Sequence, residues 1–149
     1  MSSTVCLQMQ TAKFIFVEAY VFIKHIDWVD EETGVANVLV SNGRIDILCF
    51  SHPFDGSVGD ILTAPLYCLD AENVVVSKQS EAYVQKNDSL GYFGYSVCGK
   101  LIDRKKHIVS VGEDILLSLE NDYIPNDISE GDDIMFDVLR MDVCMHCTK

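Results

Sequence analysis

The chain has 149 residues, which is enough for one domain with a sizeable core, and 48% of them are apolar, which excludes a disordered composition. Lys and Arg total 11 against 23 Asp and Glu, for a net charge of −12. Such a charge repels phosphate backbones and favours basic partners, although it also simply keeps many soluble proteins monomeric.

The N-terminal region is expected to begin with a flexible arm at 1–12, which lacks the basic and apolar regions of a signal peptide. The run 14–28 is rich in aromatic and β-branched residues, which favours a long strand; two strands or a buried helix are the alternatives. Glu18 and Lys24 interrupt this run, so it is a poor membrane span. We therefore expect a cytoplasmic protein with no membrane association.

The middle of the chain carries turn signals between apolar runs. Asn42-Gly43 is a strong hairpin signal, because a type I′ turn needs positive φ at both central residues. Pro65 lies inside the run 60–69, which indicates an edge or bulged strand because proline cannot donate a hydrogen bond. The run 92–102 is also strand-like, and its glycines are typical of bends in barrels.

An internal echo relates two stretches, 34–70 and 107–143. In each, two apolar runs flank a Gly-containing turn, and after a loop a Gly-Asp pair precedes another apolar run. These pairs are Gly59-Asp60 and Gly131-Asp132. We interpret the echo as two related half-units.

About eight to ten short strands with regular turn signals predict an all-β fold. We expect a single antiparallel β-barrel over 13–143, either OB-like or closed, with at most one or two short helices and a C-terminal tail at 144–149. The OB-like shape is an analogy with a familiar barrel and carries no functional claim.

No catalytic constellation is visible. The four histidines have no metal-ligand spacing, His52 is the best acid/base candidate, and nucleophile-elbow and phosphate-loop motifs are absent from the sequence. Cys144 and Cys147 could be half a zinc site or a redox pair, but no second pair completes it, so ordinary thiols are the simpler interpretation. We predict a protein that is not an enzyme and has no metal or cofactor. The remaining strand cysteines are expected to act as small hydrophobes: Cys49, Cys68 and Cys98.

The most distinctive surface feature is the acidic loop, residues 120–133. Its spacing departs from an EF-hand, so calcium binding is not favoured. A solvated loop is one interpretation; a contact for a basic protein, with apolar anchors inside an acidic rim, is the other. Asp132 is a weak candidate, since its echo Asp60 indicates a structural role. The predicted partner-binding residues are Asp30, Glu31, Glu32, Asp122, Tyr123, Ile124, Asp127, Glu130 and Asp133.

These observations predict a non-enzymatic acidic protein that binds a basic macromolecular partner. In size, charge and lack of catalytic motifs the chain is similar to immunity proteins, inhibitors whose acidic surface mimics phosphate and blocks a basic nuclease-like toxin. One alternative is a barrel that binds a small ligand or single-stranded nucleic acid, and another is an enzyme with an unrecognised site. The nucleic-acid alternative uses Tyr92, Phe93 and Tyr95 for stacking and Lys100, Arg104, Lys105 and Lys106 as a basic cluster.

Overall fold

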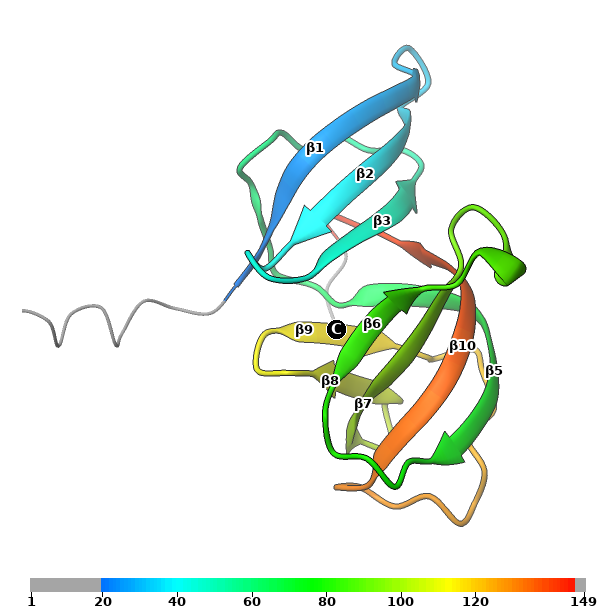
Figure 1. The fold of residues 1–149 in the computed structure, drawn as a ribbon. Helices are drawn as coiled ribbons and strands as arrows, with labels where there is room; N and C mark the ends of the chain where they lie inside the picture. Colours follow the sequence, from blue (N-terminus) through cyan, green and yellow to red (C-terminus); the bar gives the residue numbers. More distant parts are fainter. Residues whose placement is uncertain (1–19, 147–149) are drawn as a thin grey trace, which may run out of the picture.

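The computed structural model describes residues 20–146, and within this range the chain is built almost entirely of strands (Figure 1). The prediction of an all-β fold is confirmed. The predicted strand at 14–28 is found from Val21 onward, and 14–19 lie outside the described residues, as do the arm 1–12 and the end of the tail. The strands are β1 (Val21–Asp30), β2 (Val35–Ser41), β3 (Asp46–Ser51), β4 (Ile61–Leu62), β5 (Leu66–Val76), β6 (Tyr83–Lys86), β7 (Tyr95–Asp103), β8 (Ile108–Val111), β9 (Ile115–Ser118) and β10 (Asp133–Asp142), with one 3-10 turn, η1 (Asp88–Leu90).

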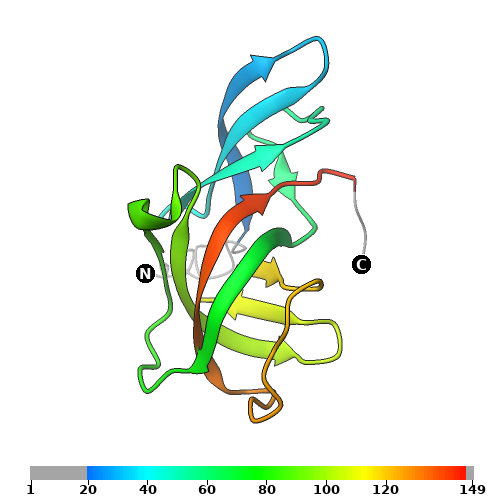
Figure 2. The same ribbon diagram turned by 90° about the vertical axis from the view of Figure 1, so that its right-hand side faces the viewer.

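Five strands close into a barrel in the order β10-β5-β9-β8-β7, because β10 pairs with both β5 and β7. The prediction of a closed barrel is therefore confirmed. Two pairings depart from the expected antiparallel arrangement: β5 and β9 pair in parallel within the barrel, with Leu66 opposite Leu117, and β10 pairs in parallel with β3 outside it. The strands β4-β1-β2-β3 continue the sheet beyond β10 and stand above the barrel in Figure 1 and in the turned view of Figure 2. No helix within residues 20–146 is long and apolar enough to span a membrane.

The Gly-Asp echo corresponds to two turns with the same hydrogen bonds, at 57–60 and 129–132, both Ser-x-Gly-Asp. In each, the serine N–H donates to the aspartate carboxylate at 2.9 Å. The glycines have φ of 95° and 94°, which favours glycine. Their N–H groups donate to the carbonyls of Ile23 in β1 and Leu101 in β7, both at 2.8 Å. Asp132 thus has the structural role that its echo indicated.

After each turn the chain pairs first within its own half and then crosses to the other. After the turn at 57–60, β4 pairs with β1 of the same half, and β5 then pairs with β9 of the other half. After the turn at 129–132, β10 pairs with β7 of the same half, and its end then reaches β3 of the other half, with Asp142 opposite Phe50. Each half therefore starts one strand earlier than the predicted boundaries at 34 and 107. The echo in the sequence did not include β1 and β7, because the bonds that join the two turns to these strands are between backbone groups.

The local turn predictions are confirmed in outline. Asn42-Gly43 joins β2 and β3 as a hairpin, but only Gly43 has positive φ, and the Asn42 side chain instead accepts bonds from the N–H groups of Arg44 (2.9 Å) and Ile45 (2.7 Å). This turn is therefore not type I′. Pro65 separates β4 from β5, so the predicted single strand at 60–69 is divided; β4 lies at the edge of the sheet as expected, whereas β5 lies between β10 and β9.

The barrel interior is filled by aliphatic and aromatic side chains, with strand residues alternating between core and surface. The first half has its own packed contact between Trp28 and Phe54, with ring centroids 5.9 Å apart. The three strand cysteines are buried and not in disulfides, so their prediction as small hydrophobes is confirmed. Buried barrel residues include Val97, Leu101, Val109, Val111, Ile115, Leu117, Ile134, Phe136 and Val138.

Candidate functional site

Hydrogen bonds from Arg104 hold the acidic loop against the barrel. The Arg104 guanidinium donates to the carbonyl of Ile128 at 2.8 Å and to that of Ile124 at 3.1 Å, and its backbone N–H donates to the Glu130 carboxylate at 2.9 Å. Ile124 is 3% exposed and belongs to the core. The prediction of Ile124 as a surface anchor is therefore wrong, because the loop folds its apolar residues inward over the barrel end.

The other predicted residues of this loop differ in what they offer a partner. Glu130 accepts the Arg104 bond, and Asp133 is paired with Lys100 at 3.2 Å. Tyr123 is 72% exposed and Asp127 is also exposed, so both are accessible.

The turn at 30–32 is exposed and holds the remaining predicted carboxylates, Asp30, Glu31 and Glu32. Asp30 accepts a bond from the Glu32 N–H at 3.2 Å, within the turn itself. In Figure 1 this turn lies at the upper tip of the molecule and the acidic loop at the lower end of the barrel. The structure therefore does not bring the two predicted acidic segments together.

Asp122 is the predicted carboxylate with the most unfavourable surroundings. Burial raises its pKa, the Ala71 N–H bond lowers it, the neighbouring Asp70 raises it and His107 lowers it. Its Oδ2 is buried and has no hydrogen-bond partner within residues 20–146. The bond with Ala71 and the proximity of Asp70 place Asp122 beside β5, the strand that carries further carboxylates.

The structure forms an acidic hollow that the sequence did not indicate. It has a volume of about 270 Å³ and lies where η1 meets β5 and β10. Glu72 and Asp137 are opposite each other in the β5–β10 register, so their side chains share one face. The residues that line the acidic hollow are Asp70, Glu72, Ser89, Leu90, Asp137, Val138 and Leu139.

Asp137 is held in place by two side-chain donors. The Ser96 hydroxyl donates to Oδ1 at 2.8 Å, and the Asn73 amide donates to Oδ2 at 3.2 Å. Asn73 and Asp70 have φ of 58° and 56°, and Asn73 lies at an irregularity in the β5–β10 pairing. Asn and Asp tolerate this left-handed region better than other residues with a side chain, which explains their presence here. The hollow is therefore built on rigid strands.

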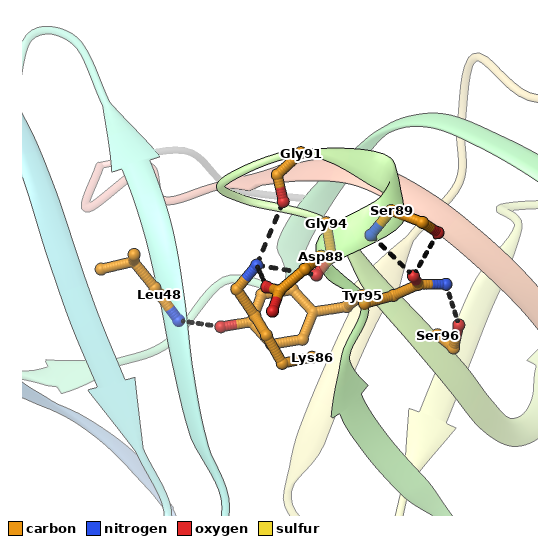
Figure 3. A network of polar contacts seen from close by, with 9 residues as sticks. Leu48, Lys86, Asp88, Ser89, Gly91, Gly94, Tyr95 and Ser96 are labelled. Atoms are coloured by element: carbon orange, nitrogen blue, oxygen red, sulfur yellow. Dashed lines mark hydrogen bonds and ion pairs between the residues drawn. The ribbon is translucent and has the colours of Figure 1, made fainter.

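One wall of the hollow comes from residues 87–94, which we term the aromatic loop (Figure 3). Lys86 holds this loop: its ammonium donates to the carbonyls of Gly91 (3.1 Å) and Gly94 (3.4 Å) and lies 3.2 Å from the Asp88 carboxylate. The Asn87 side chain caps η1. These bonds fix the loop in one conformation.

Tyr95, directly after the aromatic loop, links the two halves. Its hydroxyl accepts a 2.8 Å bond from the N–H of Leu48 in β3, and its side chain is 5% exposed. Figure 3 shows this bond reaching across from β7 to β3. Burial raises the pKa of Tyr95. Tyr95 is therefore a structural residue and is not free to stack on a base, which removes one residue of the nucleic-acid alternative.

The predicted basic cluster is also divided. Lys100 pairs with Asp133 and Arg104 binds carbonyls of the acidic loop. Lys105 and Lys106 line a separate hollow of about 290 Å³ that also contains His107, Ile108 and Glu120. The cluster therefore does not form one continuous basic surface.

The predicted absence of a metal site is tested only in part. Within residues 20–146, no group of three or more His, Cys, Asp or Glu side chains is placed to hold a metal ion. Cys144 is disulfide-bonded, so its interpretation as an ordinary thiol is wrong, and Cys147 lies outside the described residues. His52 is exposed in the loop after β3.

Sequence signals for the acidic hollow were weak, because its carboxylates are isolated acidic residues on the exposed face of two strands. Glu72 and Asp137 meet only through the β5–β10 pairing, which joins segments far apart in the chain. Comparison of the chain with family models, with curated proteins and with solved structures found no match, so a functional argument must rest on the chemistry of these surfaces.

Proposed function

We propose that this chain is a non-enzymatic binding protein whose acidic surface recognises a basic macromolecular partner, with the acidic hollow as the point of contact. One observation carries the proposal: Asp70, Glu72 and Asp137 line one hollow, and no Lys or Arg is among its described lining residues. Uncompensated carboxylates in a concave site favour a cation.

The hollow suits a lysine or arginine side chain of the partner. The charged end can form charge-assisted hydrogen bonds with the carboxylates, while the methylene stem packs on Leu90 and Leu139. Asp137 is already positioned by Ser96 and Asn73, so its contribution needs little reordering on binding.

The acidic residues elsewhere support association at longer range. Asp127 and the turn 30–32 are exposed and lie away from the hollow, so they act through the field of a protein with net charge −12. Such a field raises the association rate and weakens with salt.

The more specific proposal is an inhibitor of the immunity type, acting in the cytoplasm on a basic, nuclease-like toxin. The active site of such a partner is built to bind phosphates, and an acidic surface can occupy it in their place. The net charge of −12 and the carboxylates of the hollow support this proposal.

The test compares two double variants that remove the same charge. Asp70→Asn with Glu72→Gln neutralises the hollow, and asparagine tolerates the left-handed φ at position 70. Glu31→Gln with Glu32→Gln is the control at the distant turn. Binding of a lysine-rich synthetic peptide is measured by fluorescence anisotropy across a range of salt concentrations.

We expect the binding of the peptide to be sensitive to salt. The affinity should fall about tenfold in the hollow variant, a loss of about 1.4 kcal/mol of binding free energy, and much less in the control. Equal losses in both variants would mean that overall charge, and not the hollow, attracts the peptide. Absence of binding to the wild type even at low salt would refute the proposed function.

A further inference from the structure

The aromatic loop also carries an aromatic surface that continues onto both halves of the molecule. Tyr92 packs edge-on against Phe93, with ring centroids 4.9 Å apart, and Phe93 packs edge-on against Phe50 of β3 at 6.4 Å. The Arg140 guanidinium lies 4.5 Å from the centre of the Phe50 ring. We call these four residues the aromatic row.

The inner part of the row has a structural role. Phe50 and Phe93 are half-buried against each other where β3 meets the aromatic loop. Arg140 is held by the Asp142 carboxylate through bonds of 2.7 and 3.0 Å, which keeps the guanidinium over Phe50.

Tyr92 is the outer end of the row and is not part of the core, since it is 67% exposed. The loop beneath it is fixed by Lys86, so the ring is presented on a rigid support. Tyrosine and arginine are the residues most enriched among those that dominate binding energies, and a pre-positioned ring costs little entropy on binding.

The aromatic row adjoins the acidic hollow through the loop itself. Leu90 lines the hollow and Tyr92 follows two residues later. Leu139, which also lines the hollow, is 44% exposed. One partner segment can therefore contact the carboxylates and the exposed ring together.

We infer that the partner is a protein segment in which a lysine or arginine is flanked by an aromatic or branched aliphatic side chain. The basic side chain enters the acidic hollow and the apolar one packs on Tyr92 of the aromatic row. This inference rests on the proposed function and specifies its partner. Charge complementarity selects a protein over a nucleic acid, because the carboxylates of the acidic hollow repel phosphates.

The test uses two synthetic peptides of equal charge. One alternates lysine with glycine, and in the other a single glycine next to a lysine is replaced by phenylalanine. Both are measured by fluorescence anisotropy against the wild type, Tyr92→Ser and Tyr123→Ser. Tyr123, which is 72% exposed on the acidic loop, is the matched control.

We expect the phenylalanine peptide to bind the wild type about tenfold more tightly than the glycine peptide. Tyr92→Ser should abolish this gain while leaving the glycine peptide bound, and Tyr123→Ser should preserve it. Circular dichroism spectra of both variants test whether they are folded.

Three results would overturn the inference: no gain from phenylalanine, a gain that survives Tyr92→Ser, or an equal loss of the gain in Tyr123→Ser. Tyr92-dependent binding of single-stranded oligothymidylate at physiological salt would also overturn it, in favour of a nucleic-acid surface. In the first two cases the glycine peptide still binds through the hollow. If the wild type binds neither peptide, the proposed function fails together with the inference.

Discussion

Removal of the Tyr95 hydroxyl tests how the two halves are held together. In Tyr95→Phe the ring keeps its packing, and only the acceptor for the Leu48 N–H is lost. The ring is 5% exposed and Leu48 is half-buried, so water replaces this bond poorly. A buried donor left without an acceptor costs about 1–3 kcal/mol. This is a large fraction of the total stability of a domain, about 5–15 kcal/mol.

The halves should nevertheless unfold together in this variant. The N–H of Val143 donates to the Phe50 carbonyl at 2.9 Å, and the Ser51 hydroxyl donates to the Val143 carbonyl at 2.8 Å. These bonds keep β3 joined to the end of β10. We therefore expect a lower urea midpoint with an unchanged dependence on urea.

Two probes measure this transition. Trp28 is the only tryptophan and lies in the first half beside Phe54, so its fluorescence reports on that half, whereas circular dichroism reports on both. Amide hydrogen exchange should show lost protection at Leu48. The control Tyr92→Phe, at an exposed ring, should change stability by less than about 0.5 kcal/mol. A similarly small effect of Tyr95→Phe, with Leu48 still protected, would refute this account of the link.

The remaining predictions concern single groups. Because burial raises the pKa of Asp122, the folded state holds its proton more tightly than the unfolded state, and the group costs stability as pH rises above its ordinary value of 3.8. Asp122→Asn should therefore raise the melting temperature at neutral pH but not below pH 3.8, and an equal change at both would contradict this. Asp60→Ala and Asp132→Ala should each cost about 1 kcal/mol in urea unfolding, since they remove the same bond from matching turns; clearly unequal losses would count against that equivalence. Burial raises the pKa of Cys49 and Cys68, so neither should react with a thiol reagent at mildly alkaline pH until the protein unfolds, and labelling of the native protein would contradict this.

Much of the fold could be predicted because it is encoded locally. Alternation of apolar residues and the turn residues indicated the strands, and Pro65 indicated an irregularity in the run 60–69, where the structure separates β4 from β5. The Gly-Asp pairs of the two Ser-x-Gly-Asp turns were visible as an echo, because the turn needs glycine at positive φ and an aspartate that accepts a bond from the N–H three residues back. These are short-range requirements, and a sequence pattern records them directly.

The candidate site depends on contacts between distant segments. The sequence determined an acidic all-β protein and the turns that connect its strands, whereas only the tertiary structure placed Ile124 in the core and Glu72 opposite Asp137. Barrel closure through β10 decides which isolated carboxylates meet, and the Arg104 bonds decide which face of the acidic loop is covered. The physical reason is that strand register and burial are set by the whole core, and the residues that meet in the hollow carry no common local pattern.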